Sequence, residues 1–197
     1  CVELLCQWMQ GVDDLYVANK KGHHAAHLAG SAPVLQTLYE NGADLWVNDP
    51  KERSPLFFAS FHGRADCVAF LLEIGPGAGR KLDSLQAGDF QGDSPLHAAC
   101  LCGRLQCVGL LLYFLRNIPN KRGLSPQQLA ETAGHAQVAA YVGEIERQRA
   151  AMGDAPSDQV FGTSFASLSA IMLYYGSRWT KLYDGDQDCC YFYDNVT

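Results

Sequence analysis

The hexapeptide Ser94-Pro95-Leu96-His97-Ala98-Ala99 has three counterparts elsewhere in this chain of 197 residues. They begin at residues 24, 54 and 125, and they read His-Ala-Ala-His-Leu-Ala, Ser-Pro-Leu-Phe-Phe-Ala and Ser-Pro-Gln-Gln-Leu-Ala. Successive starts are 30, 40 and 31 residues apart. A chain that repeats itself at a period of roughly 20 to 50 residues is typical of a stack of structural repeats.

The residues around each hexapeptide predict a pair of helices. A serine before a proline indicates a helix start, because the hydroxyl accepts a hydrogen bond from an unpaired amide and proline gives up no needed donor there. A glycine nine residues after the start is predicted to end this first helix in the left-handed conformation, and an apolar second helix follows. These glycines are Gly63, Gly103 and Gly134.

A turn is predicted just ahead of three of the hexapeptides. It is indicated by the pairs Asn19/Gly22, Asp89/Gly92 and Asn120/Gly123. The hexapeptide at residue 54 differs, since Glu52 stands where the other turns have glycine. Because this position favours a residue without a side chain, we expect the second turn to be strained or reshaped.

These features, together with the segment Asn41-Gly42-Ala43-Asp44, resemble the ankyrin repeat family. That family shares a turn, Thr-Pro-Leu-His, two antiparallel helices and Asn-Gly-Ala-Asp. The resemblance covers residues 1 to about 143 and implies an all-α fold, an α-solenoid of helix-turn-helix units whose turns project to one side as fingers. Phe57 and Gln128 replace the histidine of the pattern. Gln127 replaces a core leucine, which suits a terminal capping repeat that faces solvent.

The predicted organisation has an ankyrin domain, a linker and a small module. The domain spans residues 1–148, with a partial repeat at 1–18 and repeats at 19–47, 48–88, 89–119 and 120–148. The repeat at 48–88 carries about seven extra residues between Gly75 and Asp89. Residues 149–176 are the linker, for which a helix at 160–175 is one interpretation. Because Cys1–Gly11 has the pattern of the second half of a helix, we expect the chain to be part of a longer protein.

The module at 177–197 has a different pattern. Trp179-Thr180-Lys181-Leu182-Tyr183 and Cys190-Tyr191-Phe192-Tyr193-Asp194 flank a turn at 184–186, which predicts a two-stranded β-hairpin. This segment resembles the first two strands of a WW domain, and the resemblance implies that Tyr191 and Tyr193 belong to the face that binds Pro-rich peptides. A third strand would follow Thr197, so we expect an incomplete WW-like module, with a simple aromatic hairpin as the alternative.

Three histidines, His23, His24 and His27, are close enough in sequence to suggest a metal site. The ankyrin resemblance instead places His27, like His97, at a structural histidine that makes local hydrogen bonds. We therefore expect a scaffold role for His27 and no metal ligand.

The cysteines are also expected to belong to the scaffold. Cys67 and Cys107 occupy equivalent positions on the apolar faces of second helices, which predicts buried thiols, and Cys100 aligns with a small residue between helices. Cys102 falls on an exposed position and is the one thiol expected to react. Without a Cys-x-x-Cys pair, zinc and dithiol redox sites are weak alternatives, and we expect no catalytic residue, metal or cofactor.

Partner contacts are assigned by the resemblance to the fingers and to the last two residues before each inter-helix glycine. These positions are Lys20, Lys21, His23, Lys51, Arg53, Phe61, His62, Phe90, Gln91, Asp93, Leu101, Cys102, Lys121 and Arg122. Phe61, Phe90 and Leu101 form an apolar group at exposed positions, unless they pack against the insertion at Gly75–Gly88. The finger charges change sign along the chain and the net charge is −6, so we expect no nucleic-acid partner.

The sequence thus predicts a protein-interaction scaffold or adaptor rather than an enzyme. Its partners are a protein on the ankyrin surface and a Pro-rich peptide on the WW-like module when that module is complete. The alternatives are a substrate-recruiting region of a larger multidomain enzyme and a structural subunit of an assembly. We expect a monomeric repeat domain in the cytoplasm or nucleus, and no stretch is long and apolar enough to span a membrane.

Overall fold

The computed structural model describes residues 17–77 and 85–151. The chain divides into two units, Cys1–Arg147 and Gln148–Thr197, and the second is described only where the last helix enters it. The partial repeat predicted at 1–18 lies almost wholly outside the described residues, and so do most of the linker and the WW-like hairpin. The described part contains no β-strand, and the hairpin stays a prediction.

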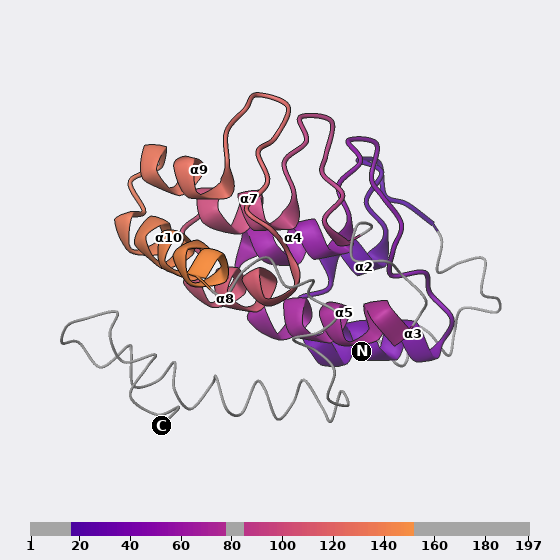
Figure 1. The fold of residues 1–197 in the computed structure, drawn as a ribbon. Coiled ribbons are helices and arrows are strands. Elements are labelled where there is room, and N and C mark those ends of the chain that lie inside the picture. Colours follow the sequence, from indigo (N-terminus) through magenta and orange to yellow (C-terminus); the bar gives the residue numbers. More distant parts are fainter. Residues whose placement is uncertain (1–16, 78–84, 152–197) are drawn as a thin grey trace, which may run out of the picture. The chain divides into compact units, whose positions relative to one another are not determined.

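The described residues fold into four helix pairs, each a shorter first helix followed by a longer second one (Figure 1). The pairs are α2 (Ala25–Leu28) with α3 (Ala32–Glu40), α4 (Pro55–His62) with α5 (Ala65–Gly77), α7 (Pro95–Leu101) with α8 (Leu105–Phe114), and α9 (Pro126–Thr132) with α10 (Ala136–Ala151). The helical repeat fold that the sequence predicted is confirmed.

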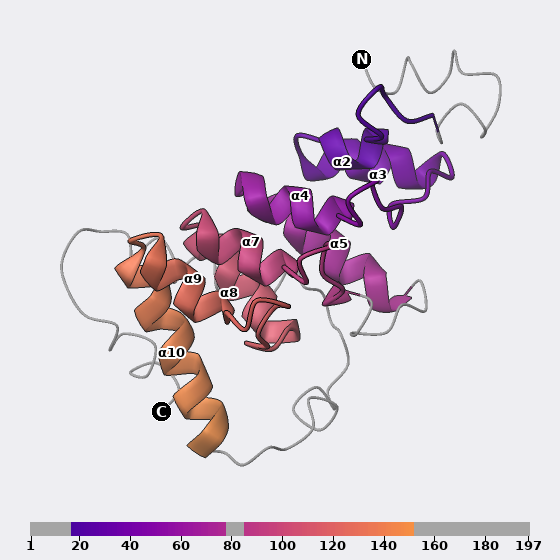
Figure 2. The same cartoon turned by 90° about the horizontal axis from the view of Figure 1, so that it is seen from above.

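The helices form two rows. The first helices α2, α4, α7 and α9 contact one another in this order, and in the second row α3 contacts α5 and α5 contacts α8. Viewed from above, the pairs follow one another in chain order (Figure 2). The largest fully buried side chains come from both rows, which places the core between them. They include Leu35, Leu56, Leu71, Leu96, Leu111 and Leu112.

The helix starts have the predicted chemistry. The Oγ atoms of Ser54, Ser94 and Ser125 accept hydrogen bonds from the amide three residues on, at 3.2, 3.4 and 3.3 Å. The glycines predicted to end the first helices all have positive φ, from 66° to 81°. Helix α2 has only four residues, because its unit reaches Gly30 early.

The turns before the first helices project on one side as four fingers (Figure 1). We call them finger 1 (residues 19–23), finger 2 (49–53), finger 3 (89–93) and finger 4 (120–124). Each opens with an asparagine or aspartate whose Oδ1 accepts hydrogen bonds from the amides two and four residues on, at 2.8–3.1 Å. One side chain therefore holds each finger in shape.

Glu52 is strained without reshaping finger 2. Its φ is 64°, and it is the only non-glycine residue with positive φ among the described residues. Its amide still donates to the Asp49 carbonyl at 2.9 Å, as the Gly22 amide does to Asn19 in finger 1. Of the two predicted outcomes the structure has the strained one, with a cost of about 1–2 kcal/mol for a side chain in this conformation.

The last first-row helix, α9, has the exposed outer surface expected of a cap. Gln128 and Glu131 are exposed, whereas Gln127 is half-buried. The Gln127 amide lies against the position that a Cβ on Gly143 would take, at 3.2 Å, and its Nε2 donates to Glu131 at 3.0 Å. Gln127 therefore lies over the end of the core rather than facing solvent fully.

The end of the insertion in the second repeat packs against the second-row side of the molecule. Leu85 is 3% exposed, and its side chain and that of Trp46 both lie close to Gly75. Gln86 exchanges hydrogen bonds with the backbone of Arg116. Among the described residues, no helix has the length and apolar character needed to cross a membrane.

Candidate functional site

The fingers are joined to one another through their backbones. The Phe90 amide in finger 3 donates to the Lys51 carbonyl in finger 2 at 3.3 Å, and the Lys121 amide in finger 4 donates to the Gln91 carbonyl at 3.0 Å. The equivalent residue of finger 2 is Pro50, which has no amide hydrogen. Side chains on fingers 2 to 4 are therefore presented at fixed spacing.

Finger 2 instead packs tightly on finger 1. The Pro50 ring lies 2.4 Å from where a Cβ on Gly22 would stand. Since φ at Gly22 is also +77°, only glycine is compatible with both the turn and the contact.

Two buried histidines, His27 in α2 and His97 in α7, each link their own first helix to the next finger. The Nδ1 atom of His97 accepts from the Ser94 amide at 3.1 Å, so its Nε2 carries the hydrogen and donates to the Leu124 carbonyl at 3.1 Å. His27 does the same with the His24 amide and the Arg53 carbonyl, both at 3.1 Å. Burial lowers the pKa of both rings, which keeps them neutral.

The predicted structural role of His27 is therefore confirmed, because both of its ring nitrogens are used in hydrogen bonds. The second repeat has Phe57 at the corresponding place, so the joint between the second and third repeats has no such histidine bond. That joint is bonded instead by the Phe90 amide to the Lys51 carbonyl, by Arg104 to the Phe61 carbonyl and by Gln86 to the Arg116 backbone.

Two predicted contact residues, His23 and Arg53, serve the joint between fingers 1 and 2. The Arg53 guanidinium is 2.6 Å from Asp49 Oδ2 and lies over the Phe58 ring at 4.6 Å. The His23 ring packs edge-on against the same ring at 4.9 Å, with 14% of its side chain exposed. Burial raises the pKa of the Asp49 carboxyl, but the hydrogen bonds from Arg53 and from the Lys51 amide, with the charge of Arg53, together outweigh burial and the pKa is lowered.

Asp93 and Arg122, also predicted as contacts, connect fingers 3 and 4. Asp93 Oδ1 accepts from Asn120 Nδ2 at 2.5 Å, and its Oδ2 lies 3.2 Å from Arg122 Nη2. Asp93 and Arg122 therefore help to hold fingers 3 and 4 together, in addition to any contact with a partner.

The remaining finger positions predicted as contacts are exposed. They are Lys20, Lys21, Lys51, Phe90, Gln91 and Lys121. Phe61 and Leu101, at equivalent places near the ends of α4 and α7, are 41% and 43% exposed, and Phe90 is 55% exposed. We call these three residues the apolar patch. The described end of the insertion instead lies beside Gly75 and bonds to the Arg116 backbone, and it leaves the patch uncovered.

Two arginines near the ends of α4 and α7 were not among the residues predicted from the sequence. Arg104 Nε donates to the Phe61 carbonyl at 3.4 Å, and Arg64 Nη1 donates to the Ala29 carbonyl at 2.7 Å. Each directly follows an inter-helix glycine and reaches back to the preceding repeat, and the recurring Gly-Arg pair was the available signal. His62 is exposed beside Phe61, and burial together with Arg64 and Arg104 lowers its pKa.

Comparison with known proteins supports the repeat assignment. The family described as Ankyrin repeats (3 copies) matches residues 22–122, about half of the chain. The chain belongs to the ankyrin repeat family. It is 30% identical over 115 residues to mouse Ankyrin repeat domain-containing protein 37, a match that covers 57% of this chain and 68% of that protein.

Two further relatives are longer proteins that match this chain over only part of their length. Mouse Diacylglycerol kinase iota is 34% identical over 122 residues, 59% of this chain, and Ankyrin repeat and SOCS box protein 11 of Pongo abelii is 30% identical over 109 residues, 54% of this chain. The chain spans only 11% of the kinase and 31% of the second protein.

Three of the four described cysteines are core residues, as predicted. Cys67, Cys100 and Cys107 are 0% exposed, and burial raises the pKa of each thiol to about 12. The expectation for Cys102 needs correction, because it is half-buried at the end of α7 rather than exposed. Burial raises the pKa of this thiol too, although Arg104 opposes the shift. Cys102 is therefore less suited to act as a nucleophile than its position suggested.

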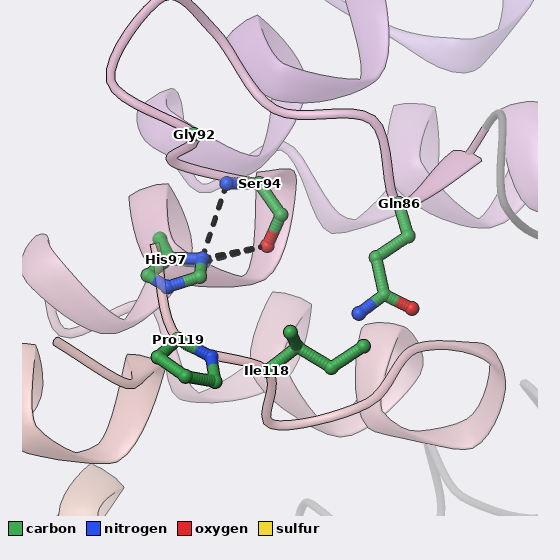
Figure 3. A pocket seen from close by; sticks show the side chains of 6 residues that line it. All are labelled: Gln86, Gly92, Ser94, His97, Ile118 and Pro119. Atoms are coloured by element: carbon green, nitrogen blue, oxygen red, sulfur yellow. Dashed lines mark hydrogen bonds between the residues drawn. The ribbon is translucent and has the colours of Figure 1, made fainter. Parts of the chain in front are cut away.

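A shallow hollow lies between finger 3 of the ankyrin domain and the segment that leads into finger 4 (Figure 3). Its volume is about 260 Å³, and its lining residues are Gln86, Gly92, Ser94, His97, Ile118 and Pro119. The Ser94 hydroxyl bonds to His97 at 2.8 Å, and Gln86 is bonded to the Arg116 backbone. Since these polar groups already have partners, the apolar patch is the better candidate for a binding site.

Proposed function

We propose that this ankyrin chain is a protein-interaction module, a scaffold or adaptor that binds a partner protein through the fingers and the apolar patch. The observation that carries the proposal is the exposure of Phe61, Phe90 and Leu101 on neighbouring repeats. Large apolar groups gathered on a surface usually mark an interaction site, and aromatic residues dominate the energetics of such sites.

We propose further that these repeats bind rather than catalyse. The buried histidines and cysteines have structural roles: His27 and His97 bond across joints between repeats, and Cys67, Cys100 and Cys107 lie in the core. A second candidate is a recruiting region within a larger multidomain enzyme. It is favoured by the match to Diacylglycerol kinase iota, a kinase by name, of which the matching part is a small share.

The finer parts of the sequence prediction belong to this proposal as well. The WW-like module at 177–197 would add a Pro-rich peptide as a second partner, held by Tyr191 and Tyr193. Titration of a Pro-rich peptide against the full-length protein and its Tyr191→Ala/Tyr193→Ala variant tests this, and equal affinities would contradict it. We also propose a monomeric repeat domain that works in the cytoplasm or nucleus, to be checked by light scattering and by imaging of the tagged protein.

The main proposal is tested by affinity purification from cells. The Phe61→Ala/Phe90→Ala/Leu101→Ala variant is expected to lose a partner that the unaltered protein recovers. The control is Leu28→Ala/Tyr39→Ala/Ile118→Ala, which removes side chains of similar exposure, 53%, 46% and 52%, from other places. Recovery of every partner by the first variant, or equal losses from both, would refute the proposed surface.

A further inference from the structure

The basic side chains of the fingers are more available to a partner than the acidic ones. Together they carry six basic and four acidic residues, although the chain as a whole has a net charge of −6. Three of the four carboxylates are used within the fingers: Asp49 and Asp89 accept from backbone amides, and Asp93 binds Asn120 and Arg122. Only Glu52 extends a carboxylate from an exposed position without a hydrogen bond or ion pair among the described residues.

The lysines of the fingers, unlike most of the carboxylates, are exposed and form no ion pairs among the described residues. Lys20, Lys21 and Lys51 are exposed, and within the described residues none of them is in an ion pair. Lys121 is exposed too, and its ammonium donates to the Phe90 carbonyl at 3.0 Å. The charge offered to a partner is therefore mainly positive, and one ammonium is held beside the apolar patch.

The helix-end side of the patch is basic as well. Arg104 is exposed and bonded to the Phe61 carbonyl, and the lowered pKa of His62 reflects, after burial, the positive charges of Arg64 and Arg104. Cations thus lie on the finger side of the patch, at Lys51 and Lys121, and on its helix-end side, at Arg104.

We propose that the partner of this surface is an acidic protein segment that places large apolar side chains against Phe61, Phe90 and Leu101 and carboxylates on the lysines of the neighbouring fingers. This inference rests on the proposed function and adds the chemistry of the partner. Opposite charge at the rim speeds encounter and selects the partner, while the buried apolar contact supplies most of the affinity.

The spacing of the fingers limits the pattern of the segment. Each finger contributes two chain passes to the row, and hydrogen-bonded passes lie about 4.8 Å apart, so successive fingers are about 10 Å apart. An extended chain advances about 3.3 Å per residue and crosses one finger in about three residues. A carboxylate about three residues to either side of the apolar residue that contacts Phe90 therefore reaches Lys51 on finger 2 or Lys121 on finger 4.

Nucleic acid is the other polyanion that lysines attract. It is disfavoured here because the cations surround an apolar patch, and because Glu52 lies next to Lys51 on finger 2.

The experiment pans a random 12-residue peptide library on the 197-residue chain. The most enriched peptide is then titrated by fluorescence polarisation against the unaltered protein, Lys51→Glu, Lys121→Glu and the patch variant Phe61→Ala/Phe90→Ala/Leu101→Ala. Arg147→Glu is the matched charge control, since Arg147 is exposed on α10 and, among the described residues, bonds to Glu144 and to the Gly143 carbonyl of the same helix. A single-stranded oligonucleotide of random sequence is titrated in parallel.

The expected result is enrichment of net-acidic peptides that contain a large apolar residue. Each lysine reversal weakens their binding about five-fold or more at low salt, in line with the loss of an attractive and gain of a repulsive charge, and the Arg147→Glu control stays within about two-fold. High salt weakens binding to the unaltered protein and largely removes the difference between it and the lysine variants.

Other outcomes separate this inference from the proposed function. Enriched peptides that lack acidic residues, or that ignore both lysine reversals but depend on the patch, would overturn the partner chemistry and leave the proposed function standing. Binding that survives loss of the patch would overturn both. Absence of any enriched peptide, or tighter binding of the oligonucleotide than of the peptide, would overturn the acidic segment as the partner.

Discussion

His97 Nε2 donates a hydrogen bond to the carbonyl oxygen of Leu124, 27 residues further along the chain, at 3.1 Å. This bond connects the start of helix α7 to the base of finger 4. It shows how the repeats hold the fingers in place, because one ring fixes its own helix start and the next finger together.

Replacing His97 is expected to weaken the joint in two steps. In His97→Gln the new amide oxygen keeps the bond to the Ser94 amide, as Gln128 does with the Ser125 amide at 2.9 Å, so only the bond to Leu124 is lost. We expect a loss of about 1 kcal/mol for this variant and about 2–4 kcal/mol for His97→Ala, which also leaves a cavity and an unpaired buried amide. Urea unfolding measures both, and equal losses would show that the inter-repeat bond contributes nothing separable.

The neutral histidines make stability depend on pH. Burial lowers the pKa values of His27 and His97 below their ordinary 6.5, so the unfolded chain binds protons that the folded chain does not. Their contribution is complete above pH 6.5 and falls as the pH drops towards the folded pKa values, by at most about 1.4 kcal/mol per pH unit for each ring. Thermal unfolding between pH 7.5 and 5.5 should show this fall, and His27→Gln/His97→Gln should show less of it. An unchanged pH dependence in the double variant would contradict the assignment.

Glu52→Gly is expected to stabilise the protein by about 1 kcal/mol, because it removes a side chain from the left-handed conformation. The matched control is Lys51→Gly in the same finger, whose φ is not positive and which should bring no gain. The melting temperature is expected to rise in Glu52→Gly and not to rise in Lys51→Gly. A lower melting temperature for Glu52→Gly would mean that the Glu52 side chain has a stabilising contact that outweighs the strain.

Comparing alanine substitutions at Gly22 and Gly123 distinguishes the cost of backbone strain from the cost of steric crowding. Both have φ near 76°, but a Cβ at Gly22 would lie 2.4 Å from Pro50, whereas a Cβ at Gly123 meets no atom within 4 Å. We expect Gly123→Ala to cost about 1 kcal/mol, the price of the left-handed conformation, and Gly22→Ala to cost clearly more because fingers 1 and 2 must move apart. Equal losses in urea unfolding would contradict the close packing of these fingers.

Local features of the fold were predictable from the sequence. The Ser-Pro helix starts, the glycines that end the first helices and the Asn/Asp-to-Gly turns use groups only a few residues apart, so their chemistry can be read without knowing the fold. The strain at Glu52 was predictable for the same reason, as one of two outcomes.

Contacts between repeats were harder to predict. Nothing near His97 indicates that its partner is the Leu124 carbonyl, and nothing near Asp93 indicates that it binds Arg122. Such bonds depend on how the repeats stack, and for that reason His23 and Arg53 proved to be parts of a joint although they occupy contact positions. Cys102 was expected to be exposed because its position is variable in the family, but in the structure it is half-buried.

Amide hydrogen exchange of the chain, alone and in complex with a purified partner, shows whether a partner protein binds across the fingers and the apolar patch. We expect new protection in peptides that contain fingers 2 to 4 and the ends of α4 and α7, and unchanged exchange in the second-row helices α3, α5 and α8. Protection confined to the second-row helices, with the fingers exchanging as they do in the free chain, would contradict it.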